Sequence, residues 1–118
     1  MKRVLIIEDD YDWQKIYEVS LSDKVHITTA YTPSEAQKCF EEGQFDLIVF
    51  DGCVGGNGST LDTPPLVRKW REAGFTGPMI AASGDPRYRN ILMGSGCDYQ
   101  ASKFNVPKKV LELLDLTN

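Results

Sequence analysis

Val4-Leu5-Ile6-Ile7-Glu8-Asp9-Asp10 changes abruptly from four apolar residues to three acids, and this contrast is the first indication of the architecture. A short apolar run rich in β-branched residues is typical of a strand buried on both faces of a parallel sheet. Leu47-Ile48-Val49-Phe50-Asp51 has the same arrangement and again ends in an acid. The sequence therefore predicts two buried strands whose carboxyl ends carry carboxylates.

Outward from these two runs, short apolar segments alternate with helical patterns along the whole chain. Further strands are predicted at residues 25–29, 79–82 and 98–102. Helices are predicted to begin at residues with capping character or at a proline, namely Asp10, Thr32, Thr63, Asp85 and Pro107. Five strands alternating with five helices predict an α/β fold: a doubly wound, flavodoxin-like, five-stranded parallel sheet of order 2-1-3-4-5 with helices on both faces.

The side chains expected inside this fold follow from helical spacing. The first helix carries its apolar residues, Trp13, Ile16, Tyr17 and Leu21, at such spacing. Trp13 and Trp70 are expected to belong to the core rather than to a cofactor site. Residues 52–62 are rich in glycine and are expected to form a loop. This loop lacks the lysine of a phosphate-binding loop, so we expect it to be a lid or a partner loop.

Length and composition narrow the class of protein. The 118 residues predict one domain, 1–118. Thirteen basic and seventeen acidic residues give a net charge of -4, which disfavours direct nucleic-acid binding. The cysteines are not paired in sequence and the chain has one histidine, so no zinc ligand set is present; they are Cys39, Cys53 and Cys97. Free thiols and the lack of a long apolar run predict a cytoplasmic protein that does not enter a membrane.

Chemically active side chains collect where the predicted strands end. The first strand ends in Glu8 and Asp9, the third in Asp51, the fourth in Ser83 and the fifth in Lys103. Ligands of such sheets bind at the carboxyl ends of strands one and three, so the acids are expected to meet. Oxygen ligands without histidine or cysteine favour Mg²⁺. A nucleophilic aspartate beside a hydroxyl and a lysine is suited to a phosphoryl group.

Four segments that contain these residues also carry a family resemblance. They are Ile6-Ile7-Glu8-Asp9-Asp10, Phe45-Asp46-Leu47-Ile48-Val49-Phe50-Asp51, Ala81-Ala82-Ser83-Gly84 and Gly96-Cys97-Asp98-Tyr99-Gln100-Ala101-Ser102-Lys103. In order and with plausible spacing, they resemble the receiver domain of two-component response regulators, in the stand-alone form of a chemotaxis regulator. The similarity covers nearly the whole chain and implies the same sheet as the apolar pattern.

The resemblance implies a role for each site residue. Asp51 would be the phosphoacceptor, charged by a histidine kinase or a phosphotransfer protein, with Ser83 and Lys103 contacting phosphoryl oxygens. The implied Mg²⁺ ligands are Glu8, Asp9, Asp51 and the backbone carbonyl of Cys53. The domain would catalyse only its own phosphorylation and dephosphorylation, so it would not be an enzyme in the usual sense. Its signal would pass to a downstream protein.

Three departures from the family pattern support an alternative function. Phe104 stands where receivers usually have proline, and Gln100 where they usually have an aromatic switch residue. The loop after Asp51 contains glycines instead of a proline-glycine turn. The alternative is therefore a pseudo-receiver, an interaction module that does not depend on phosphorylation. A phosphatase or a flavodoxin is disfavoured, because Glu8-Asp9-Asp10 matches neither the acidic motif of the first nor the phosphate loop of the second.

Overall fold

The computed structural model describes residues 1–52 and 61–116, which are built around a parallel sheet. The strands are β1 (Arg3–Ile7), β2 (His26–Ala30), β3 (Leu47–Phe50), β4 (Met79–Ala81) and β5 (Tyr99–Gln100). Their order is β2-β1-β3-β4-β5, which confirms the predicted fold class. In the pairing of β1 with β3, Ile7 lies opposite Phe50, so both strands end at the same edge.

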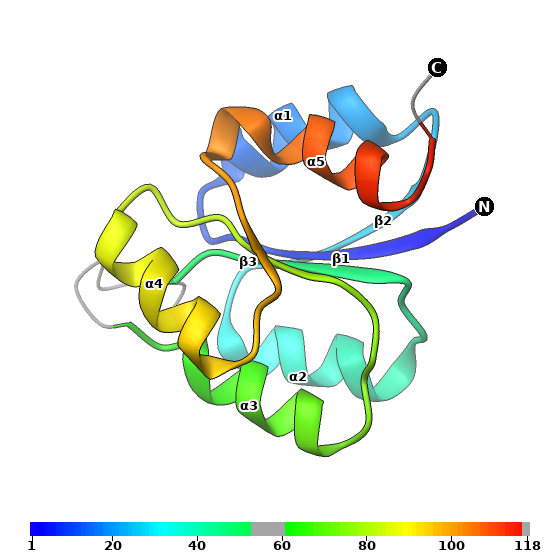
Figure 1. Cartoon of the computed structure of the whole chain (residues 1–118). Coiled ribbons are helices and arrows are strands. Elements are labelled where there is room, and N and C mark those ends of the chain that lie inside the picture. The colour runs from blue at the N-terminus through cyan, green and yellow to red at the C-terminus, as the bar shows by residue number, and fades with distance from the viewer. Residues whose placement is uncertain (53–60, 117–118) are drawn as a thin grey trace.

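Helices cover both faces of the sheet. They are α1 (Tyr11–Leu21), α2 (Pro33–Glu42), α3 (Pro64–Glu72), α4 (Pro86–Ser95) and α5 (Val106–Leu113), and a 3₁₀ turn, η1 (Lys103–Asn105), precedes the last. Figure 1 shows α1 and α5 on one face and α2 and α3 on the other. Side chains of α4 join the core on the α2 and α3 side.

The sheet separates two hydrophobic cores, because successive side chains of a strand point to opposite faces. Leu5 and Ile7 belong to the core under α2, α3 and α4, whereas Val4 and Ile6 belong to the core under α1 and α5. Trp70 is fully buried in the first core and stacks on Phe40 at a ring-centroid distance of 4.4 Å. This confirms the prediction that Trp70 is a core residue.

Three predicted helix starts are confirmed by capping hydrogen bonds. The Asp10 carboxylate accepts from the backbone N–H groups of Asp12 and Trp13 at the start of α1. The Thr32 hydroxyl accepts from the N–H of Glu35, and the Asp85 carboxylate from that of Arg87. Such side-chain oxygens satisfy donors that the first turn of a helix leaves free.

The buried stripe of α1 differs from the apolar pattern of its sequence. Gln14, Tyr17 and Leu21 face the interior, and their spacing of three and four residues follows one side of the helix. Ile16 falls outside this stripe and is exposed, while Trp13 is half-buried. A polar residue therefore occupies a core-facing position, which apolar periodicity could not reveal.

The last strand is shorter than the sequence indicated. β5 contains only Tyr99–Gln100, and both side chains are exposed. α4 continues to Ser95, and Gly96 follows with a φ of 137°, a conformation that favours glycine. Early termination of β5 matters for the site, because the chain turns at once into η1 and so presents Lys103 at the sheet edge.

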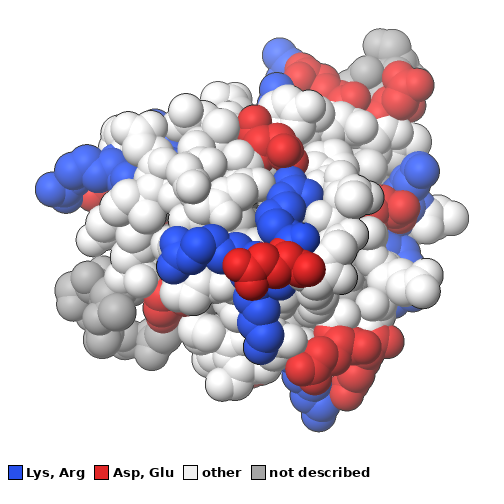
Figure 2. Space-filling model, turned by 60° about the horizontal axis from the view of Figure 1, so that its bottom comes forward, with Lys and Arg blue, Asp and Glu red and all other residues white. Residues whose placement is uncertain are grey.

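Charged side chains of both signs are mixed on the face formed mainly by α2 and α3. Figure 2 shows acidic and basic groups next to one another there, without a broad area of one sign among the described residues. Over residues 1–52 and 61–116, no helix has the length and apolar character needed to cross a membrane.

Candidate functional site

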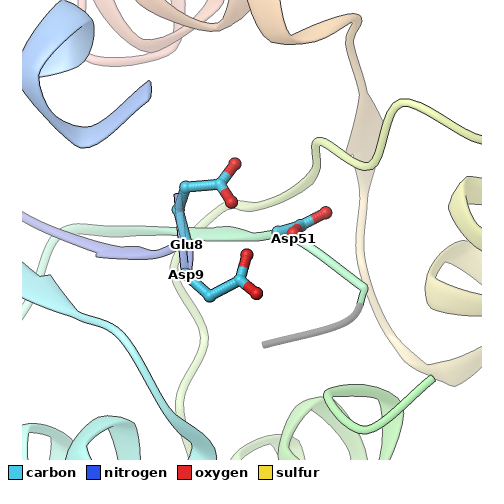
Figure 3. Close-up of side chains that lie close together, drawn as sticks. All are labelled: Glu8, Asp9 and Asp51. Carbon is cyan, nitrogen blue, oxygen red and sulfur yellow. The ribbon is translucent and has the colours of Figure 1, made fainter. Parts of the chain in front are cut away.

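Three carboxylates meet at the edge where β1 and β3 end. Glu8 and Asp9 follow β1 directly, and Asp51 follows β3, whose pairing with β1 continues through a hydrogen bond from the Asp51 N–H to the Ile7 carbonyl (2.9 Å). One oxygen from each carboxylate lies within 4.8 Å of the others. Figure 3 shows the three groups pointing into a common space. The parallel register thus brings Asp51 next to Asp9 and Glu8, which precede it in sequence by 42 and 43 residues.

Lys103 supplies the positive charge of this edge. Its Nζ lies 2.7 Å from Glu8 Oε1 and 3.8 Å from Asp51 Oδ2. The same ammonium group lies 5.7 Å from the centroid of the Trp13 ring, which shields it on one side. In this arrangement the lysine is bound mainly to Glu8 and remains within reach of Asp51.

Burial raises the pKa of two of these acids, Glu8 and Asp51. Glu8 is 2% exposed, and desolvation together with the charge of Asp51 raises its pKa from 4.5 to about 7, despite the opposing effect of Lys103. Burial also raises the pKa of Asp51, although Lys103 and the Gly52 N–H, which donates to Oδ1, oppose the shift. Burial alone would lower the pKa of Lys103, but its contacts with Glu8 and Asp51 raise it. The cluster therefore holds more negative charge than a single lysine neutralises.

Ser83 lies buried after the end of β4, on the same edge of the sheet. Its hydroxyl accepts a hydrogen bond from the Asp85 N–H (3.2 Å), and its carbonyl accepts one from Arg89 Nη1 (2.9 Å). The described hydrogen bonds of Ser83 thus run towards α4 and not to the carboxylates. Arg89 also donates to Gln100 Oε1 (3.3 Å), which links α4 to β5 at the position of the missing aromatic residue.

Two buried polar residues that support the site were missed from sequence. The Gln14 amide nitrogen donates to the carbonyl oxygens of Ile6, Glu8 and Ala30, fixing the backbone on which Glu8 stands. The Thr63 hydroxyl donates to the carbonyl of Asp51 at 2.7 Å. The capping position of Thr63 before two prolines was visible in the sequence, but its contact with a residue twelve positions away was not.

Replacing Thr63 by valine tests whether this hydroxyl supports the end of β3. Valine has nearly the same shape, so the change removes the hydrogen bond and leaves the Asp51 carbonyl without this donor. We expect the free energy of unfolding to fall by about 1–2 kcal/mol. Chemical denaturation measures this loss, and Thr76→Val, at an exposed position, is the matched control. An unchanged free energy in Thr63→Val would contradict the assigned role.

The donor set fits a hard divalent cation. Glu8, Asp9 and Asp51 offer only carboxylate oxygens, the ligands that Mg²⁺ prefers, and Asp9 is exposed and so leaves a route from solvent. A cation there would also neutralise the excess charge of the cluster. The fourth predicted ligand, the carbonyl of Cys53, lies outside the described residues.

Comparison with solved structures finds the same fold in response regulators. A two-component response regulator from Clostridium difficile is similar with a TM-score of 0.82 and 23% identity, over 98% of this chain and 97% of that one. A response regulator from Thermotoga maritima, in complex with Mg²⁺ and BeF, is similar with a TM-score of 0.80 and 24% identity, over 99% of this chain and 100% of that one. A response regulator from Burkholderia pseudomallei, with a phosphorylated aspartic acid, calcium ion and citrate, is similar with a TM-score of 0.81 and 17% identity, over 97% of this chain and 66% of that one.

The sequence comparisons are negative. No protein-family model matches the chain, and no curated protein matches it. The structural similarity therefore establishes the fold, and the chemistry has to be argued from the residues at the carboxyl edge of the sheet.

Proposed function

We propose that this chain, which has the fold of response-regulator receiver domains, is a phosphoacceptor module of a two-component phosphorelay. The observation that carries the proposal is the convergence of three carboxylates and Lys103 at the end of β1 and β3. Solved structures of the same fold include one with Mg²⁺ and BeF and one with a phosphorylated aspartic acid. The phosphoacceptor in this chain is Asp51.

The proposed step transfers a phosphoryl group from a phosphohistidine of a kinase or phosphotransfer protein. A carboxylate oxygen of Asp51 forms the new bond to phosphorus as the bond from phosphorus to the histidine nitrogen breaks, and the freed imidazole takes up a proton. Bound Mg²⁺, held by Glu8, Asp9 and Asp51, would supply positive charge that offsets the phosphoryl oxygens. Lys103 pairs with one of these oxygens, which requires its Nζ to move away from Glu8.

Ser83 provides the second contact to the phosphoryl group. Its hydroxyl accepts from the Asp85 N–H, so its own proton is free to be donated to a phosphoryl oxygen. Arg89 donates to the Ser83 carbonyl and to Gln100, so a shift of the backbone at Ser83 would also move α4 and β5. Added negative charge at Asp51 would in this way change the surface offered to a downstream protein. The domain acts only on its own phosphoryl group.

Intact mass spectrometry after incubation with acetyl phosphate tests the proposal. With Mg²⁺, we expect one phosphoryl adduct on the wild-type protein and on Asp23→Asn, an exposed acid changed as a control. Asp51→Asn, and wild type with a chelator, are expected to give none. An adduct that persists in Asp51→Asn would contradict the assignment.

A second candidate, a pseudo-receiver, is favoured by the region around β5. Gln100, at the position of the usual aromatic switch, is exposed and bound to Arg89. Phe104, at the position of the usual proline, is 81% exposed. Such a module would bind its partner whether or not Asp51 is phosphorylated. Partner affinity that is the same for wild type, phosphorylated wild type and Asp51→Asn would establish this candidate instead.

A further inference from the structure

Two buried polar atoms of α1 have no hydrogen-bond partner among the described residues. They are the hydroxyl of Tyr17, which is 1% exposed, and Oε1 of Gln14, which is 2% exposed. Unpaired buried groups are costly and are rare in native proteins. The orientation of Gln14 is explained by the three carbonyls that its nitrogen contacts. Nothing in the apolar core explains why residue 17 is a tyrosine instead of a phenylalanine.

Strand alternation places Tyr17 on the same side of the sheet as the Glu8 side chain. Tyr17 packs in one core with Val4 and Ile6. Glu8 continues this series of alternate residues, so its side chain leaves β1 on the same face. Side chains of a helix lean towards its N-terminus, and α1 begins just after the acids. The Tyr17 ring therefore leans towards the edge that carries Glu8.

Contacts through Trp13 connect the same groups. The centroids of the Trp13 and Tyr17 rings lie 5.8 Å apart. Lys103 Nζ lies 5.7 Å from the centroid of the Trp13 ring. That Nζ in turn contacts Glu8. Burial, and then the charges of Glu8 and Asp51, raise the pKa of Tyr17, so its hydroxyl keeps its proton and is available as a donor.

Glu8 will need a new donor if Lys103 leaves it. In the described arrangement Glu8 Oε1 contacts Lys103, and Oε2 accepts a long hydrogen bond from the Asp10 N–H (3.2 Å). The Glu8 carboxyl also shares a side-chain hydrogen bond with Asp51. A neutral hydroxyl can replace the lysine without adding a charge next to a bound cation. We propose that Tyr17 is a positioning residue, whose hydroxyl donates to the Glu8 carboxylate when Glu8 exchanges Lys103 for a divalent cation. This inference rests on the proposed function of the same site.

Tyr17→Phe tests the inference, with Tyr11→Phe as the matched control. Both residues are tyrosines of α1, but Tyr11 is 67% exposed. Thermal unfolding without Mg²⁺ first shows that each variant is folded, and removal of an unpaired hydroxyl is expected to leave Tyr17→Phe as stable as wild type or more so. Mg²⁺ affinity is then measured by calorimetry, and the near-ultraviolet difference spectrum of tyrosine is recorded on Mg²⁺ addition.

We expect Mg²⁺ affinity to fall about tenfold in Tyr17→Phe, the effect of losing one hydrogen bond to a charged group, and to be unchanged in Tyr11→Phe. The tyrosine difference signal should disappear in Tyr17→Phe alone, which a merely structural role would not predict. Wild-type affinity in Tyr17→Phe, or a difference signal that survives there, overturns the inference while leaving the proposed function intact. If wild type itself binds no Mg²⁺, both fail together.

Discussion

Without divalent cations, the free energy of unfolding is expected to fall by about 3 kcal/mol between about pH 5 and pH 8. The cause is the pKa of Glu8, which folding raises from 4.5 to about 7 through burial and the charge of Asp51. Between these two values the folded protein holds a proton that the unfolded chain has lost. The folded state then binds more protons than the unfolded state, so its stability decreases as the pH rises.

Urea denaturation at a series of pH values measures this loss, and two comparisons identify its origin. Saturating Mg²⁺ is expected to restore most of the stability at about pH 8, because a cation compensates the carboxylates. Asp51→Asn, which removes the charge next to Glu8, is expected to show a shallower pH dependence than wild type. A stability that is flat with pH in wild type, or a slope that Asp51→Asn leaves unaltered, would show that the acids are not coupled in this way.

Replacing Lys103 by methionine is expected to destabilise the protein by about 2–3 kcal/mol at about pH 8. The change removes the cation that lies 2.7 Å from Glu8 and leaves a buried carboxylate without its partner. Methionine is long enough to keep the packing against Trp13, so the loss reports charge more than volume. At about pH 5 Glu8 is protonated, and the cost is expected to fall below about 1 kcal/mol.

Lys108→Met is the control for this substitution, because Lys108 is exposed on α5 and makes no described ion pair. Its free energy of unfolding should match that of wild type at both pH values. Equal destabilisation of Lys103→Met at both pH values would assign the effect to packing instead of to the pairing of Lys103 with Glu8.

The parts of the structure that follow from sequence are those that depend on local pattern and on sheet topology. Continuous apolar runs identified the buried strands, and the parallel order placed Glu8, Asp9 and Asp51 at one edge before any contact was known. The capping roles of Asp10 and Thr32 were also readable, because capping residues lie within three residues of their acceptors or donors.

The parts that do not follow from sequence depend on contacts between distant segments. Gln14, and not Ile16, faces the core from α1, because its amide nitrogen donates to carbonyls that only the folded sheet brings near it. Whether Lys103 pairs with Glu8 or with Asp51 depends on differences of about an ångström. The spacing of residues in the sequence cannot predict distances this finely.

Calorimetric titration of Mg²⁺ at about pH 8 tests the central claim most directly, namely that the acids at the end of β1 and β3 form a divalent-cation site. The account predicts one ion bound per wild-type chain, with affinity at least about tenfold lower in Asp51→Asn, which loses a charged ligand, and unchanged in Asp23→Asn. No saturable binding to wild type, or equal binding to wild type and Asp51→Asn, would contradict it.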